Sequence, residues 1–149
     1  MTRLPSAVLF ACTMNAIRSP MAEALLKHFH GRRIYVDSCG VRPSGEGVDP
    51  FAVAVMDEIG IDLSRHRTKS FQELEDNSFD LVISLSPEAQ HSAVELTRTM
   101  SCDVEFWPML DATAVEGSRE ARLDAYRSVR DALRRRIVQR FPLPPGANL

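Results

Sequence analysis

The sequence predicts a single α/β domain in three layers, with a four-stranded parallel sheet flanked by helices on both faces. Short apolar runs of strand length alternate along the chain with longer segments whose apolar residues recur at helical spacing. Strands that alternate with helices are typical of a parallel sheet buried on both sides. The length of 149 residues suits one hydrophobic core. We therefore expect residues 1–141 to form one domain and the proline-rich residues 142–149 to be a frayed tail.

The first strand and the first helix are joined by a short loop. Residues 7–11 form a continuous apolar run that predicts a buried strand, and apolar residues recur at helical spacing over residues 21–29. Ser19 is expected to cap this helix, Pro20 to take its first position, and Glu23 to add negative charge to its opening turn. The loop thus leads into a helix N-terminus.

The same patterns predict three more strands and three more helices. The strands are residues 34–36, 80–85 and 104–107. The helices are residues 51–59, which begin after Asp49-Pro50 and stop at Gly60, residues 87–100, and an Arg-rich segment from about 119 to 141. Residues 42–49 are rich in proline, serine and glycine, so we expect a mobile loop there.

Composition and charge narrow the class of partner. The chain is 44% hydrophobic and 26% charged, with a formal net charge of -2, so nothing draws it as a whole toward nucleic acid or an anionic membrane. No segment is long and apolar enough to span a bilayer, and the apolar run after Arg3 is shorter than the core of a signal peptide. We expect no nucleic-acid partner and no membrane association, so any anion site must be local.

The cysteines and histidines argue against a metal centre. The chain has three cysteines, an odd number without metal-ligand spacing: Cys12, Cys39 and Cys102. The four histidines also lack ligand spacing, so structural or solvent-facing roles are expected for them. We expect no disulfide framework, no metal and no cofactor, and a cytoplasmic location, where thiols stay reduced.

Cys12 and Arg18 bracket the loop that follows the first strand. In an open parallel sheet, ligands bind beyond the carboxyl ends of the strands, which is where this loop lies. A helix N-terminus offers unpaired N–H groups and about half a positive charge, which suit a phosphate-sized anion. The planar guanidinium of Arg18 can hold two phosphoryl oxygens. The same field favours the thiolate, which is the nucleophilic form of cysteine, so Cys12 is a candidate nucleophile.

Residues 8–25, VLFACTMNAIRSPMAEAL, contain the motif C-x5-R-S close to the N-terminus. This stretch resembles the phosphate-binding loop and following helix of the low-molecular-weight protein tyrosine phosphatase family. The resemblance extends through residues 37–40, 60–66 and 79–83 and so covers nearly the whole chain. It implies a flavodoxin-like, Rossmann-like fold and one metal-independent phosphatase domain. The implied enzyme hydrolyses phosphomonoesters, in first place protein phosphotyrosine, through a cysteinyl-phosphate.

The resemblance also implies roles for individual residues. Cys12 would be the nucleophile, Arg18 the phosphate clamp, and Asp111, at the place of the family's Asp-Pro-aromatic motif, the general acid and base. An acid is needed because an alkoxide or phenolate leaves poorly. Asn15 would hold the backbone turn of the loop, and Ser19 would donate a hydrogen bond to the thiolate. The implied phosphate-binding loop comprises Thr13, Met14, Asn15, Ala16, Ile17, Arg18 and Ser19.

The implied partners follow from this chemistry. The substrate would be a phosphorylated protein or a small phosphomonoester, with phosphotyrosine first and phosphoarginine as another possibility. Phosphate and vanadate-like anions would bind in the same loop.

Several positions depart from the family pattern. Ile17 stands where many members have a second cysteine that forms a protective disulfide with the nucleophile, so that redox switch is absent. Met14 stands where the family commonly has glycine, and it could narrow the entrance. Ala112 and Thr113 replace the proline and the aromatic that stacks on phosphotyrosine, which leaves tyrosine specificity open. Trp107 could serve as a wall instead, although an apolar residue in a predicted strand is more often part of the core.

Other functions and roles stay open at this point. Arsenate reduction would need a thiol relay through Cys39 and Cys102, and disulfide partners usually have Cα atoms within about 6.8 Å. A non-catalytic phosphate-binding module is a third possibility. Asp111 could be a surface loop residue, and Cys12 an inert buried cysteine. The other two cysteines are expected to pack as small apolar side chains, and residues 134–136 to form a solvated helix face rather than a nucleic-acid patch.

Overall fold

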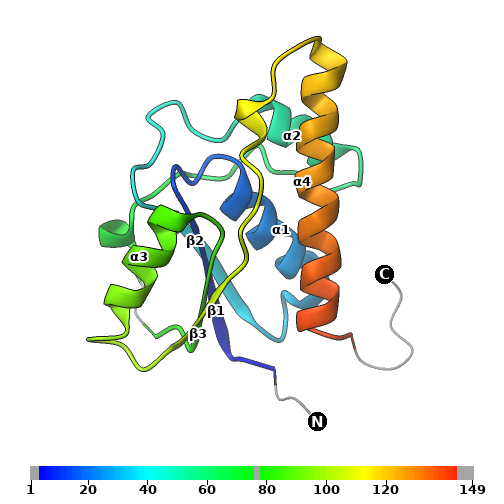
Figure 1. The fold of residues 1–149 in the computed structure, drawn as a ribbon. Coiled ribbons are helices and arrows are strands. Elements are labelled where there is room, and N and C mark those ends of the chain that lie inside the picture. The colour runs from blue at the N-terminus through cyan, green and yellow to red at the C-terminus, as the bar shows by residue number, and fades with distance from the viewer. Residues whose placement is uncertain (1–3, 76–77, 144–149) are drawn as a thin grey trace.

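The computed structural model describes residues 4–75 and 78–143, and its centre is a four-stranded parallel sheet (Figure 1). The strands are β1 (Ala7–Cys12), β2 (Tyr35–Gly40), β3 (Leu81–Ser84) and β4 (Asp103–Phe106). Their order across the sheet is β2-β1-β3-β4, and each neighbouring pair is parallel. The predicted sheet is confirmed.

Helices cover both faces of the sheet, as predicted. The helices are α1 (Arg18–His30), α2 (Pro50–Asp57), α3 (Pro87–Leu96) and α4 (Arg119–Arg140). α4 packs against α1 and α2 on one face, and α3 packs on the other face (Figure 1). Two short 3₁₀ helices, η1 (Phe71–Glu73) and η2 (Ala112–Ala114), lie in connecting segments. None of the helices in the described residues has the length and apolar character that crossing a membrane requires.

The central strand β1 is buried along its whole length and separates two clusters of apolar side chains. Val8, Phe10 and Cys12 face the larger cluster, which α1, α2 and α4 complete. The residues that alternate with them face a smaller cluster under α3. Because successive side chains of a strand point to opposite faces, this register determines the side of the sheet on which Cys12 lies.

The start of α1 differs from the prediction. The helix begins at Arg18, and its N-cap residue, Ile17, makes no side-chain cap hydrogen bond. Ser19 lies inside the first turn with its hydroxyl buried against Cys12. The first turn contains no acidic residue, because Glu23 falls in the next turn and accepts a hydrogen bond from a residue of β2. Both capping predictions were wrong because tertiary partners, rather than the helix end, bind these two side chains.

Other boundaries fall close to the predicted ones. β2 continues to Gly40, beyond the predicted end at residue 36. The prediction stopped early because the polar residues Asp37 and Ser38 interrupt the apolar run. α3 ends at Leu96, a turn before the predicted end. Trp107 lies just after β4 and is buried against Phe10 and Phe141, so it belongs to the core.

The loop of residues 42–49 leads into α2. Asp49 caps α2, where its carboxylate accepts the N–H of Phe51 at 2.8 Å. The loop of residues 42–49 is described throughout, and its mobility stays a prediction. The predicted tail of residues 142–149 lies outside the described residues apart from its first two.

Candidate active site

Residues 13–17 form a tight loop between β1 and α1, which we call the anion loop. N–H groups of the segment after β2 donate to three of its carbonyls at 2.8–3.1 Å: Arg42 to Thr13, Ser44 to Met14 and Asp49 to Ala16. Within the described chain, the N–H groups of four loop residues have no protein acceptor: Thr13, Met14, Ala16 and Ile17. Unpaired N–H groups at the start of a helix form a site for an anion.

Cys12 ends β1 at the base of the anion loop, with 2% of its surface exposed. Its sulfur lies 2.9 Å from the hydroxyl oxygen of Ser19 and accepts the N–H of Asn15 at 3.3 Å. The Ser19 oxygen already accepts the side-chain amide of Asn15 at 2.8 Å, so its own hydrogen is free to be donated. The sulfur is closer to it than the carbonyl of Cys39, which lies at 3.3 Å. The geometry therefore favours a hydrogen bond from Ser19 to Cys12.

The side chain of Asn15 ties the anion loop to the elements around it. Its backbone has a φ of 54°, in the left-handed region that asparagine tolerates better than most residues. The amide nitrogen donates to Ser19 and Ser38, and the carbonyl oxygen accepts from the Lys69 N–H and the His66 ring. All donor and acceptor positions of this fully buried amide are used.

His66 and Glu23 form the next layer behind the loop. The Nε2–H of His66 donates to Asn15 Oδ1 at 3.1 Å, since that oxygen can only accept. Nδ1 lies 3.8 Å from the carboxylate of Glu23, which accepts the Ser38 hydroxyl at 2.5 Å. Burial lowers the pKa of His66 below its ordinary value of 6.5, against the opposing effect of Glu23. The ring is therefore neutral at pH 7.

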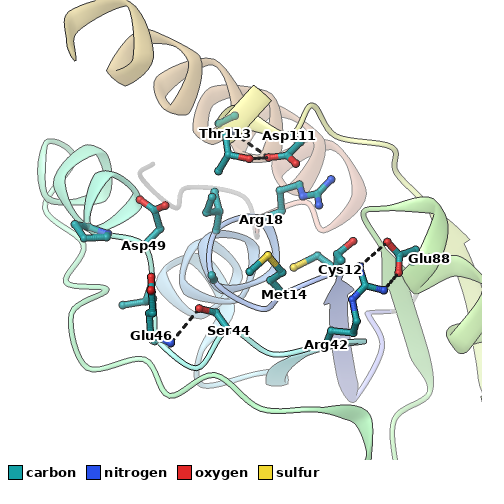
Figure 2. A pocket seen from close by; sticks show the side chains of 17 residues that line it. Cys12, Met14, Arg18, Arg42, Ser44, Glu46, Asp49, Glu88, Asp111 and Thr113 are labelled. Carbon is teal, nitrogen blue, oxygen red and sulfur yellow. Dashed lines mark hydrogen bonds and ion pairs between the residues drawn. The ribbon is translucent and has the colours of Figure 1, made fainter. Parts of the chain in front are cut away.

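Arg18 opens α1 and lines the same cleft as Cys12. Its Nη1 donates to the carbonyl of Met109 at 3.2 Å, which leaves the other N–H groups of the fork for a bound anion. Figure 2 shows Arg18 and Asp111 on the same side of the cleft. The residues on this side of the cleft therefore come from the first helix and from the segment before α4.

The cleft has a volume of about 510 Å³ (Figure 2). Its walls come from the anion loop, from the segment of residues 42–50, from the start of α3 and from residues 111–113. Met14 is half exposed at its rim, as expected. No aromatic side chain is among the lining residues of the described chain. Carboxylates line the cleft instead, from Glu46, Asp49 and Asp111.

Asp111 lies at the mouth of the cleft and at the N-cap of η2. Its Oδ1 accepts both the N–H of Thr113, at 3.0 Å, and the Thr113 hydroxyl, at 2.6 Å. Oδ2 accepts no hydrogen bond from any side chain or backbone group of the described residues. Asp111 thus lines the cleft, as the resemblance implies, and also caps a surface turn, as the alternative interpretation holds.

Cys39 is separated from Cys12 by the sheet. It is fully buried in the cluster under α3, whereas Cys12 faces the cluster of α1, α2 and α4. Burial is the main reason that the pKa of the Cys39 thiol is raised well above its ordinary value. Both observations agree with the expectation that Cys39 is a packed apolar side chain.

Cys102 lies at the far end of the sheet. It precedes β4, in which Asp103 pairs with Leu81, and Leu81 in turn pairs with Val8 of β1. Cys102 is therefore five residues, or about 16 Å along the strand direction, from the level of Cys12. Neither this cysteine nor Cys39 is placed to form a disulfide with Cys12.

The structure thus brings together Cys12, Arg18, Asp111 and the anion loop around one cleft. Sequence reasoning missed other residues that surround these groups: Ser38, Arg42, His66, Glu88 and Thr113. Apart from Thr113, which is a near neighbour of Asp111 on the chain, their spacing carries no signal, because they meet only when distant loops fold onto one another. The described residues contain no group of three or more His, Cys, Asp or Glu side chains suited to a metal ion.

A parallel α/β sheet with a cysteine beneath an anion loop defines a class of cysteine-dependent phosphatases and arsenate reductases. Within it, the chain belongs to the low molecular weight phosphotyrosine protein phosphatase family, whose model matches residues 7–139.

Two curated relatives of this chain are named arsenate reductases. The chain is 34% identical over 131 residues to an arsenate reductase of Halalkalibacterium halodurans, covering 87% of this chain and 91% of that protein. It is 40% identical over 78 residues to a glutaredoxin arsenate reductase of Synechocystis sp.. That second match spans 52% of this chain and only 58% of the relative.

Solved structures of phosphatases have the same fold. A low molecular weight protein tyrosine phosphatase from T. tengcongensis is 28% identical with a TM-score of 0.73, over 89% of this chain and 95% of that one. YwlE arginine phosphatase from Geobacillus stearothermophilus is 25% identical with a TM-score of 0.70, over 89% and 88%. A YwlE mutant, at 28% identity, a TM-score of 0.70 and coverage of 89% and 91%, has a phosphorylated active-site serine in place of cysteine. The predicted flavodoxin-like fold is confirmed.

Proposed function

We propose that this protein is a metal-independent phosphomonoester hydrolase that works through a cysteinyl-phosphate on Cys12. The observation that carries the proposal is the position of the Cys12 sulfur, beneath unpaired N–H groups and 2.9 Å from the Ser19 hydroxyl. An anion held by these groups and by Arg18 has its central atom directly in front of the nucleophile. The YwlE mutant with a phosphorylated serine supports the same step in a similar protein.

In the first step, the Cys12 thiolate attacks phosphorus, an S–P bond forms and the P–O bond to the leaving group breaks. The N–H groups of the anion loop and the guanidinium of Arg18 stabilise the charge on the phosphoryl oxygens. Asp111 donates its proton to the departing oxygen, because it lies at the mouth through which the leaving group points.

In the second step, water attacks phosphorus and gives its proton to Asp111. The S–P bond breaks, phosphate leaves and the thiolate returns. The Ser19 hydroxyl assists here by donating a hydrogen bond to the departing sulfur, from which its oxygen lies 2.9 Å away. A stabilised thiolate is a better leaving group.

Phosphotyrosine in a protein is the first substrate candidate, in keeping with the name of the family. The lining of the cleft also supports a second one. It offers no aromatic side chain, and Glu46 and Asp111 line it with carboxylates that form no ion pair in the described chain. A third carboxylate, that of Asp49, also lines the cleft and accepts hydrogen bonds from the Phe51 N–H and the Tyr126 hydroxyl. A cationic leaving group such as the guanidinium of phosphoarginine would be attracted by them. Comparing kcat/KM for a phosphotyrosine peptide, phosphoarginine and a small phosphomonoester on one preparation distinguishes these substrates.

Arsenate reduction is the second function to test, because several relatives bear that name. The positions of Cys39 and Cys102 argue against an internal thiol relay. Arsenate turnover would therefore require an external thiol. If no arsenate is reduced when glutathione or glutaredoxin is present, this function is excluded.

The proposal predicts hydrolysis of para-nitrophenyl phosphate in the presence of a metal chelator, with inhibition by vanadate. Cys12→Ser should lower kcat by at least about a thousandfold, because it removes the nucleophile. Cys102→Ser is the matched control and should leave kcat unchanged. If the Cys12 variant keeps its activity, the nucleophile is assigned wrongly. If the wild-type protein binds phosphate and releases no product, the chain is a binding module instead.

A further inference from the structure

An ion pair crosses the rim of the cleft above the anion loop. Arg42 lies two residues beyond β2, and Glu88 is the second residue of α3, which follows β3. Because β2 and β3 lie on either side of β1, the pair spans the carboxyl end of the strand that carries Cys12. The guanidinium meets the carboxylate through both of its terminal nitrogens, with Nη2 at 3.1 Å from Oε1. Figure 2 shows both side chains at the cleft beside Cys12.

The carboxylate of Glu88 is unfavourable for the proposed ligand of this cleft. It lines a site for a phosphoryl dianion, which it repels. It also lies within the electrostatic reach of Arg18: the hydrogen bond from Arg42 is the main cause that lowers the pKa of Glu88, and the charge of Arg18 adds to it. Without its partner, Glu88 would compete with phosphate for the guanidinium of Arg18.

The ion pair is exposed, with 66% of the Arg42 side chain and 46% of the Glu88 side chain accessible to solvent. Exposed pairs of this kind add little to the stability of the fold. A neighbouring pair, Arg98 and Glu95, is equally exposed at the other end of α3 and does not line the cleft. The Arg42–Glu88 pair joins two segments 46 residues apart and lines the cleft, whereas Arg98 and Glu95 are three residues apart on the chain. We therefore look for a function of the first pair at the cleft.

We propose that Arg42 is a positioning residue that sets the affinity of the cleft for phosphate by holding the Glu88 carboxylate away from Arg18. The inference rests on the proposed binding of a phosphoryl group in this cleft. It concerns the strength of that binding and requires no hydrolysis, so it can be tested with inorganic phosphate alone.

The test is isothermal titration of phosphate into four proteins at low ionic strength: wild type, Arg42→Ala, Glu88→Gln and the double variant. Arg42→Ala frees a negative charge near the dianion and should raise the Kd about threefold to tenfold. Glu88→Gln should bind at least as tightly as wild type. The double variant should return to within about twofold of wild type, because the charge that Arg42 neutralises is gone. The effect of Arg42→Ala should shrink at 0.5 M salt, at which the screening length falls to roughly 4 Å.

Arg98→Ala and Glu95→Gln are matched controls, since they remove the same charges from an exposed ion pair at the other end of α3, away from the cleft, and neither should change the Kd. Arg42→Gln serves as a second variant, and circular dichroism checks that each protein is folded. A double variant as weak as Arg42→Ala would mean that Arg42 contacts the anion itself and would overturn the inference. So would an unchanged Kd in both Arg42 variants. If the wild-type protein binds phosphate but hydrolyses no phosphomonoester, the proposed hydrolysis is rejected, whereas this inference about phosphate affinity is unaffected.

Discussion

Thr113 occupies the place where the family pattern has an aromatic residue, and its hydroxyl binds Asp111. Both of its hydrogen bonds end on Oδ1, at 3.0 and 2.6 Å. In the proposed mechanism, Oδ2 is therefore the oxygen that would carry the proton to a leaving group. The two hydrogen bonds to Oδ1 also limit the rotation of the carboxyl group.

At the scale of single residues, we predict that Asp111→Asn slows poor leaving groups much more than good ones. Phenyl phosphate should lose about 10²–10⁴-fold in kcat/KM, which reports the first step alone, whereas para-nitrophenyl phosphate, whose phenolate leaves without a proton, should lose far less. Steady-state kinetics on both esters measures the difference.

The control for Asp111→Asn is the neighbouring threonine. Thr113→Val should also slow phenyl phosphate more than para-nitrophenyl phosphate, with a smaller loss than Asp111→Asn. Thr113→Ser, which keeps the hydroxyl, should behave as wild type. Equal losses of kcat/KM on both esters in Asp111→Asn would remove Asp111 from the role of acid.

The predictability of the site differs between residues for a physical reason. Cys12 and Arg18 could be predicted because a strand, a loop and a helix N-terminus are all local in sequence. Asp111 needed the resemblance to a family, since no local pattern links it to residue 12. Arg42 and Glu88 could not be predicted at all, because each is an ordinary charged residue until the sheet order places their two segments across β1.

At the scale of elements, the end of β2 supports the anion loop through close backbone contact. A Cβ atom added at Gly40 would lie 2.8 Å from the backbone nitrogen of Asn15 and 2.9 Å from the carbonyl carbon of Met14. Backbone atoms cannot move aside as the end of a flexible side chain can. The loop and strand therefore fit together only with glycine at this position.

We predict that Gly40→Ala displaces the anion loop, raises the Kd for phosphate and lowers the free energy of unfolding by about 1–3 kcal/mol. Chemical denaturation and phosphate titration measure the two effects. Gly45→Ala is the matched control, because a Cβ atom at that position meets nothing within 4 Å. Wild-type phosphate affinity in Gly40→Ala would show that the contact is not needed for the shape of the loop.

The elements themselves were largely predictable, and the exceptions share a cause. Buried strands with unbroken apolar runs, such as β1 and β3, could be read directly. β2 could be recognised only in part, because Asp37 pairs with Lys69 and Ser38 with Glu23, and such tertiary pairing makes a polar strand possible. The start of α1 was misplaced for the same reason, since Ser19 binds Asn15 and Cys12 instead of the helix end.

At the scale of the whole molecule, the buried layer behind the loop links stability to pH. The pKa of His66 is lowered in the folded protein, mainly by burial, so the unfolded chain binds the proton more readily. Acid therefore favours the unfolded state. The contribution of neutral His66 is fully present above the ordinary pKa of 6.5 and is lost as the pH falls through the lower folded value.

We predict that the free energy of unfolding falls more steeply in wild type than in His66→Gln between about pH 7 and pH 5. Glutamine keeps an N–H for Asn15 but does not titrate. The difference between the two proteins isolates the contribution of residue 66, and urea denaturation at each pH measures it. His91→Gln, at an exposed histidine, should follow wild type. A difference that stays constant with pH would contradict the proposed burial of a neutral ring.

The separation of Cys12 and Cys39 by the sheet determines how this protein can respond to peroxide. Peroxide converts a reactive cysteine into a sulfenic acid, which is rescued when a nearby thiol condenses with it. Here the neighbouring thiol along the chain lies on the opposite face, and Ile17 stands where other members have a cysteine. If Cys12 is the reactive thiolate proposed above, its rescue depends on an external thiol that enters the cleft, because neither Cys39 nor Cys102 is placed to reach it. Without such a thiol, further oxidation would give the sulfinic acid.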